Sequence, residues 1–204
     1  ATAKIIPVSS KTRDGIKDLL AELDRLLATV SAKNDFGKPR LPIDRVFSIA
    51  GFGTVVTGTL VDGSFAIGQE IEIAPGGKHG RVRGLQTHKS KLERATPGSR
   101  VAMNLSGLAV EDLARGQVVA LPGTLAATNL LDARLQYLAA APKSLEHNAE
   151  VDFFTGAAEV PARVRLLDHA ELKPGNSGWV QLQLAATGAV AKNDRFIIRF
   201  PSPS

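Results

Sequence analysis

Apolar residues recur at helical spacing in one stretch of the chain, between Ile16 and Val30. Successive apolar positions there are one or three residues apart, so their side chains form one stripe on a helix of 3.6 residues per turn. Asp14 stands where an N-cap residue is expected, and Gly37 and Pro39 follow as helix breakers. The pattern predicts an amphipathic helix that needs a partner for its apolar face.

The segment before this helix offers little to pack against. Lys4–Val8 predicts a single short strand, and one strand with one helix cannot enclose a core. We therefore expect residues 1–37 to be the last strand and helix of a larger domain that begins upstream.

After Pro39 the hydrophobic period changes from that of a helix to that of a strand. Val101, Met103 and Leu105, for example, alternate with polar or small residues. The other strand-like runs are Val46–Ile49, Thr54–Leu60, Glu70–Ile73, Gly80–Leu85, Gln117–Leu121, Ala133–Leu138, Glu150–Phe154, Ala162–Leu167, Val180–Leu184 and Phe196–Phe200. Many short strands separated by Gly, Pro, Asp and Asn turns are typical of closed barrels or sandwiches.

A break at Leu121–Pro122–Gly123 divides these strands into two halves. The stretch that follows it, Thr124–Asn129, has low strand propensity. We predict a mainly β chain, with two consecutive small β-barrels over residues 38–122 and 123–204, preceded by one amphipathic α-helix.

Composition excludes several classes of function. The chain has 204 residues, of which 44% are hydrophobic, with four His and no Cys. Without Cys, disulfide scaffolds, Cys-ligated zinc and thiol catalysis are excluded, and no HExxH motif indicates a zinc enzyme. No apolar run approaches the roughly 20 residues of a membrane span, and no signal peptide opens the chain. We expect a cytoplasmic monomer with no metal and no membrane partner.

Positive charge is concentrated between Lys78 and Arg94. This stretch holds six Lys or Arg and two His against one acid, Glu93. Such a stretch can meet phosphate, or it can be a solvated basic hairpin, and composition leaves both interpretations open.

Motifs for nucleotide chemistry and catalysis are missing or incomplete. Ser9–Ser10–Lys11 lies at the predicted strand-to-helix junction, where backbone N–H groups can meet a base, although an ordinary capped turn is the plainer explanation. The glycines of Gly51–Thr59 lead into a strand, which favours a tight turn over a dinucleotide site. The chain lacks GxxxxGK[ST], GxSxG and SxxK. We therefore expect no catalytic residue in it, and neither binding nor hydrolysis of a nucleotide.

Three charged residues lie at strand ends in the first predicted barrel. Asp44 and Arg45 follow Leu41-Pro42-Ile43, and Arg100 opens the strand of Val101. Because neighbouring residues of a strand point to opposite faces, Asp44 and Arg45 are not expected to form one surface pair. Edge-strand charges or a cross-strand ion pair would explain all three residues.

Several ordered segments resemble the translational GTPases of the elongation factor Tu superfamily. The segment from Lys4 to Ile16 resembles the end of the G domain, which makes Ser9, Ser10 and Lys11 a remnant of its last guanine-contacting motif. The helix is then left over from an α/β G domain. Val46–Thr59 resembles the opening hairpin of the second domain, a β-barrel, and Asp152–Gly156 and Arg195–Arg199 resemble the third, also a barrel.

Within this superfamily the chain is most similar to the selenocysteine-specific elongation factors, the SelB family, which match it at Asp44, Arg45 and Arg100. The resemblance implies GTP-dependent delivery of selenocysteinyl-tRNA to ribosomes at recoded UGA codons. The second domain would hold the aminoacyl end and the third the tRNA stem. GTP and Mg²⁺ would serve the full-length protein only, and an mRNA selenocysteine insertion element would be a further partner there.

The resemblance assigns Asp44, Arg45 and Arg100 to a selenocysteine pocket, and physical chemistry agrees with it. A selenol is more acidic than a thiol, whose pKa is about 8.5, so selenocysteine arrives as an anion whereas serine is neutral. Two arginines that face one cavity would be left unpaired by a neutral ligand. We expect Arg45 and Arg100 to share a cavity of the first barrel, with Asp44 in ion-pair reach of one of them.

By the same resemblance the basic stretch becomes a surface for RNA. The candidate contacts are Arg40, Arg81, Arg83, Lys89 and Lys91.

Two alternatives stay open at this point. An elongation factor Tu-like or initiation factor-like GTPase would use a different tRNA, and Arg45 and Arg100 would then serve structure. A stand-alone β-barrel module that binds protein would have no role in RNA binding, but the amphipathic helix without a partner argues against it.

Overall fold

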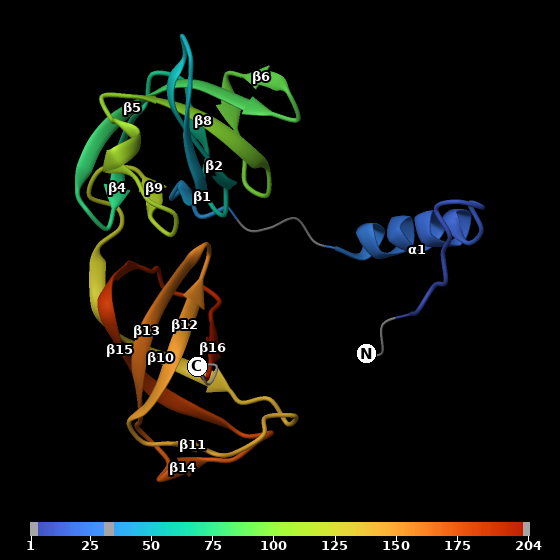
Figure 1. Cartoon of the computed structure of the whole chain (residues 1–204), viewed down its shortest axis with the longest axis vertical. Coiled ribbons are helices and arrows are strands. Elements are labelled where there is room, and N and C mark those ends of the chain that lie inside the picture. The colour runs from blue at the N-terminus through green and yellow to red at the C-terminus, as the bar shows by residue number, and fades with distance from the viewer. Residues whose placement is uncertain (1–3, 31–34, 202–204) are drawn as a thin grey trace. The chain divides into compact units, whose positions relative to one another are not determined.

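The computed structural model describes residues 4–30 and 35–201 of the chain (Figure 1). It divides into two compact units, Ala1–Asn34 and Asp35–Ser204. The smaller unit holds the helix α1 (Ile16–Thr29), and the larger is built of antiparallel strands. The prediction of a mainly β chain with one amphipathic helix at its N-terminal side is confirmed.

Helix α1 begins at the predicted place but with a different cap. Its N-cap is Gly15 and not Asp14, whose carboxylate instead accepts a hydrogen bond from the Thr12 hydroxyl at 2.6 Å. The φ of Gly15 is 70°, and a Cβ at this position would lie 2.1 Å from the carbonyl oxygen of Pro7. A tight turn that only glycine can make therefore starts the helix, and the predicted Asp14 cap is wrong.

The strand predicted at Lys4–Val8 is absent, since the described chain has no strand before Arg40. A strand needs a neighbour for its backbone hydrogen bonds, and the smaller unit offers none in its described part. The apolar stripe of α1 is exposed in the same way: no residue of the helix is buried, and Leu27 is 67% exposed.

The first barrel is a closed sheet of six antiparallel strands. Its order is β4-β9-β1-β2-β8-β5, and pairing of β4 with β5 closes it, while β6 extends β5 as a hairpin. The bounds are β1 (Arg40–Ile49), β2 (Gly53–Thr59), β4 (Glu70–Ala74), β5 (Lys78–Thr87), β6 (Ser90–Leu92), β8 (Arg100–Ser106) and β9 (Val118–Ala120). A short pair, β3 (Phe65–Ala66) and β7 (Arg94–Ala95), and the 3-10 turn η1 (Val110–Asp112) complete it.

Alternation along these strands fills the first barrel with apolar side chains. Val101, Met103 and Leu105 of β8 point inward, as predicted, and pack with Leu41 and Ile43 of β1. Strand β1 therefore starts at Arg40, six residues before the run predicted from Val46, because Arg40 to Pro42 already pair with β9 and Leu41 and Ile43 face the core.

The second barrel, β10 to β16, has a five-stranded antiparallel sheet of order β10-β15-β13-β12-β16 and a separate β11–β14 pair. Its strands are β10 (Ala127–Gln136), β11 (Leu145–Glu146), β12 (Ala149–Thr155), β13 (Ala158–Leu166), β14 (Glu171–Leu172), β15 (Ser177–Ala189) and β16 (Ile197–Arg199). Strand β10 begins inside the stretch Thr124–Asn129 that was expected to connect the barrels, because Ala127 and Thr128 pair with the end of β15. Long-range pairing here outweighs low local propensity.

We expect Leu182→Ala to unfold the second barrel far more readily than Gln183→Ala. Leu182 is fully buried in the core of that barrel, and its neighbour Gln183 on β15 is exposed. Cavity formation should lower the free energy of unfolding by about 2–5 kcal/mol for Leu182→Ala, against less than about 0.5 kcal/mol for Gln183→Ala. Denaturant unfolding followed by the fluorescence of Trp179, which lies on the same strand, measures both. Equal losses would contradict the inward orientation of Leu182.

Candidate functional site

Strand β1 carries a β-bulge at Asp44. Ile43 pairs with Gly58 of β2, and Arg45 pairs with Thr57, so Asp44 is an extra residue without a partner in the ladder. Ile43 before the bulge and Val46 after it both pack against the core of the first barrel. Asp44 and Arg45 lie between these inward positions, and both are therefore placed on the outer side. The expectation that they occupy opposite faces is wrong because the bulge interrupts the alternation.

Asp44 forms an ion pair with Arg100 across the sheet. Arg100 Nη1 lies 2.5 Å from Asp44 Oδ2, and Nη2 lies 3.1 Å from Oδ1, which also accepts a hydrogen bond from Thr57 Oγ1 at 2.7 Å. The hydrogen bonds from Arg100 first, then that from Thr57, hold the pKa of Asp44 below its usual value, and Asp44 raises the pKa of Arg100. The expected contact of Asp44 with one arginine is present.

A shallow cavity of about 320 Å³ adjoins this ion pair. It is lined by Thr57, Gln86, Thr87, His88, Lys89, Arg100, Val101 and Ala102. Its rim is the turn between β5 and β6, where His88 and Lys89 both have positive φ, 45° and 66°. Two such residues between paired strands form a type I′ hairpin turn. The Thr87 hydroxyl donates to the Arg100 carbonyl at 2.7 Å and so attaches this turn to β8.

The cavity thus combines residues that were expected with others that were not. Arg100 and Lys89 line it, whereas Arg45 does not, although the charge of Arg45 contributes to the lowered pKa of Asp44. A shared cavity for Arg45 and Arg100 stays a prediction. Sequence reasoning missed Thr57, Gln86, Thr87 and His88. A two-residue hairpin turn predicted at His88–Lys89 would have indicated His88. The sequence His-Lys, however, is not the Asn-Gly pair that usually predicts such a turn.

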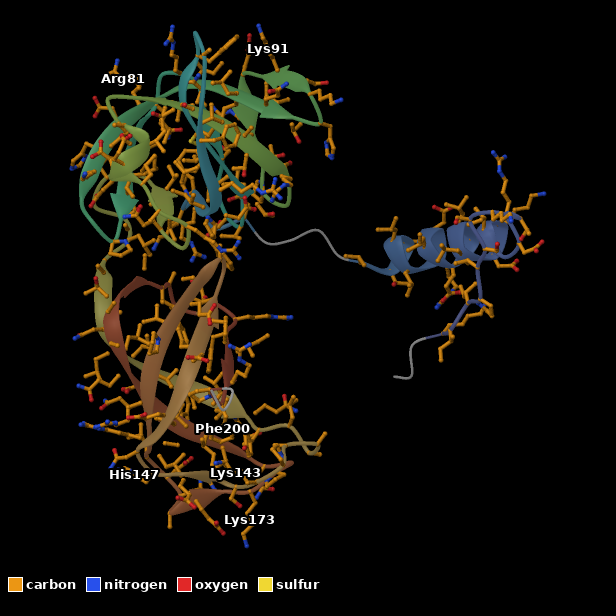
Figure 2. The ribbon with its side chains drawn as sticks, in the orientation of Figure 1. Arg81, Lys91, Lys143, His147, Lys173 and Phe200 are labelled. Carbon is orange, nitrogen blue, oxygen red and sulfur yellow. The ribbon has the colours of Figure 1, made fainter. Side chains whose placement is uncertain are left out.

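The basic stretch is spread over the first barrel and is partly neutralised. Arg81 pairs with Glu70 at 3.0 Å, and Figure 2 shows Arg81 and Lys91 on separate sides of the barrel. Arg83 is the extra residue of a second bulge, between Val82 and Gly84. Within the described ranges, Arg83, Lys89 and Lys91 are exposed and have no carboxylate in ion-pair range. These three keep their charge available for a phosphate.

Arg40, the remaining candidate for RNA contact, is engaged elsewhere. Its Nη1 lies 2.7 Å from a carboxylate oxygen of Asp194, in the loop before β16, and both side chains are largely buried. The pair joins β1 to the second barrel, so the observed contact of Arg40 is structural and its contact with RNA stays a prediction.

Ser9, Ser10 and Lys11 form a turn before α1. The Ser9 hydroxyl accepts a hydrogen bond from the Thr12 amide at 3.2 Å, and the Ser9 carbonyl accepts one from the Arg13 amide at 2.8 Å. Contact of these residues with guanine stays a prediction.

Residues 4–30 and 35–201 contain no group of three His, Asp or Glu side chains that could hold a metal ion. No helix among them is long and apolar enough to cross a membrane.

The sequence of this chain is similar to those of known translation factors. A family model of elongation factor Tu domain 2 matches residues 53–120, and a model of the β-barrel domain of selenocysteine-specific elongation factors matches residues 132–203. A selenocysteine-specific elongation factor of Desulfomicrobium baculatum is 40% identical over 201 residues, which are 98% of this chain and 32% of that protein. One of Methanocaldococcus jannaschii is 31% identical over 96% of this chain and 45% of its own length.

A solved structure of the same kind of factor has a similar fold. The apo crystal structure of translation elongation factor SelB from Methanococcus maripaludis superposes with a TM-score of 0.84 at 26% identity, over 97% of this chain and 46% of that one. The chain thus spans between about a third and a half of the length of the proteins that it matches.

We expect Asp44→Asn to destabilise the chain at neutral pH and not in acid. Because the folded-state pKa of Asp44 lies below its unfolded value, its stabilising effect is complete above the unfolded pKa, about 3.9, and is lost as the pH falls through the lowered pKa. The difference in Tm between the natural chain and the variant should therefore shrink from about pH 6 to about pH 2.

Thermal unfolding at several pH values measures this difference. Glu150→Gln is a matched control, because Glu150 also pairs with an arginine across two strands but is 75% exposed. A Tm difference for Asp44→Asn that does not change with pH would show that the carboxylate charge has no part in the effect.

Proposed function

Because this chain is a homologue of the selenocysteine-specific elongation factors over 98% of its length, we propose that it supplies the part of such a factor that holds selenocysteinyl-tRNA. In the longer protein, GTP-dependent delivery to the ribosome at recoded UGA codons would use a nucleotide site that needs GTP and Mg²⁺ and lies outside these 204 residues. Recognition of an mRNA selenocysteine insertion element would likewise belong to the longer protein.

One observation carries the proposal: the guanidinium of Arg100 is held by Asp44 at the edge of a cavity. A guanidinium has five N–H donors, and the two nitrogens that bind Asp44 leave donors free for a ligand. It also keeps its charge at any physiological pH, so it cannot adapt to a neutral ligand by losing a proton.

The charges around this cavity favour an anionic side chain. Arg100 and Lys89 line it with two positive charges, and the adjoining Asp44 contributes one negative charge. A selenolate would offset the excess positive charge, whereas the hydroxyl of serine would not. Discrimination between the two aminoacyl groups follows from the charge difference, because their sizes are similar.

We expect Arg100→Ala to weaken binding of selenocysteinyl-tRNA selectively. A charge-assisted hydrogen bond to an anion contributes about 1.5–3 kcal/mol, so the affinity of the GTP-bound full-length factor should fall roughly ten- to a hundred-fold. The weak binding of seryl-tRNA should barely change. Arg163→Ala is the matched control, since Arg163 also forms a cross-strand ion pair, but on the second barrel. Equal losses for both tRNAs would assign Arg100 to the barrel or the tRNA backbone instead.

We also expect Arg83 and Lys91 to contribute to the salt dependence of tRNA binding. Each phosphate contact adds about 0.7–0.9 to the slope of log affinity against log salt, so Arg83→Ala with Lys91→Ala should lower this slope by roughly 1.4–1.8. Arg81→Ala should lower it less, because Glu70 already compensates that charge. Titrations of the full-length factor with tRNA at several salt concentrations measure the slopes. An unchanged slope in the double variant would show that the basic stretch is solvated surface that does not contact tRNA.

A further inference from the structure

Trp179, the only tryptophan of the chain, lies on the outer face of the second barrel. It belongs to β15, whose residues Val180 and Leu182 point into the core, and its side chain is 51% exposed. Leu167, whose amide donates to the Trp179 carbonyl, directly follows the neighbouring strand β13 and is 54% exposed. Trp179 and Leu167 thus present apolar surface to solvent. They lie on the sheet in which β15 pairs with β10 and β13, three strands that Figure 1 labels.

The backbone beneath this indole is firmly held. The Trp179 amide donates to both carboxylate oxygens of Asp168, at 3.1 and 3.0 Å, and Asp168 also contacts His169 Nδ1 at 2.6 Å. The preceding Gly178 lies so close to both residues that a Cβ on it would be 3.0 Å from Asp168 Oδ1. The indole thus projects from an ordered backbone, and tryptophan has only two side-chain torsions to restrict when a ligand packs on it.

Two arginines flank the indole on the same face. Arg134 pairs with Trp179 across β10 and β15, and Arg165 pairs with Gln181, two residues further along β15. Within residues 4–30 and 35–201, neither has a carboxylate in ion-pair range, and Arg165 meets only the amide oxygen of Gln183, at 3.5 Å. Of the neighbouring acids, Asp132 accepts a hydrogen bond from the Gln181 amide and Asp168 accepts one from the Trp179 backbone, so both keep their charge but neither forms an ion pair with these arginines.

We propose that this Trp179 face, formed by Trp179, Leu167, Arg134 and Arg165, binds unpaired nucleotides of an RNA. A nucleobase stacks on the indole, and the two guanidinium groups contact the phosphates on either side of it. RNA fits better than a protein partner because the indole offers a stacking surface and the two guanidinium groups beside it have N–H donors that no ion pair of the described residues occupies, so both can contact phosphates of one strand. This inference goes beyond the aminoacyl site, which lies on the first barrel.

The fluorescence of the single tryptophan makes the proposal directly testable. Titration of the chain with an oligouridylate of about ten nucleotides should quench Trp179 in a saturable way at low salt, whereas a blunt RNA duplex should quench it weakly, because its bases are not free to stack. Absence of quenching by the single strand, or equal quenching by the duplex, would overturn the proposal.

Variants separate stacking from charge, with affinity measured by anisotropy of a labelled oligouridylate. Trp179→Ala should lose roughly 5- to 150-fold in affinity, and Trp179→Phe, which keeps an aromatic ring, should recover most of it. Arg134→Ala and Arg165→Ala should each reduce the salt slope by about 0.7, while Arg163→Ala, whose charge is paired with Glu150, should reduce it less.

Arg100→Ala should leave oligouridylate affinity unchanged, so that failure of this inference and failure of the aminoacyl site are distinguishable. Equal affinity of Trp179→Ala and the natural chain would overturn the proposal and favour a protein partner for this face.

Discussion

The extra residue at Asp44 in strand β1 is the constraint on which the site depends. A closed barrel requires apolar side chains at inward positions on both sides of any irregularity, and Ile43 and Val46 meet this requirement across the bulge. Two consecutive charged residues can then stay outside the core, because the extra residue shifts the alternation of inward and outward side chains by one position. Without the insertion, the strict alternation of a strand would direct either Asp44 or Arg45 toward the interior.

The ion pair between Asp44 and Arg100 orients the Arg100 guanidinium more than it stabilises the fold. Arg100 is half exposed, and exposed pairs contribute only about 0–1 kcal/mol to folding. Its bidentate geometry, together with the Thr57 hydrogen bond, nevertheless restricts the guanidinium to one orientation at the cavity. The second barrel differs in kind, since its distinctive surface is an aromatic side chain on an outer sheet face, beside two arginines that form no ion pair within the described residues. The two barrels thus offer different chemistry, one selective for a small charged group and the other suited to stacking.

Much of the fold could be predicted from sequence because alternation in β8 and β15 reports directly on burial. Helix α1 was equally visible in the spacing of its leucines. Features that depend on contacts between distant residues were not visible: the bulge at Asp44 appears only when β1 is paired with β2, and the early start of β10 depends on the end of β15. The same reason explains the site. Asp44 and Arg100 could be named from the family resemblance, but Thr87 and His88 become neighbours of Arg100 only through the β5–β8 pairing.

The His88–Lys89 turn has a consequence for how this chain could change over generations. A left-handed conformation costs a residue with a Cβ about 1–2 kcal/mol relative to glycine, and this turn holds two such residues in succession. Asn-Gly would form the same turn with less strain, so substitutions toward these residues would raise thermal stability. Each would also remove an imidazole or an ammonium group from the cavity rim. Selection for thermal stability and selection for discrimination between ligands therefore favour different residues at positions 88 and 89.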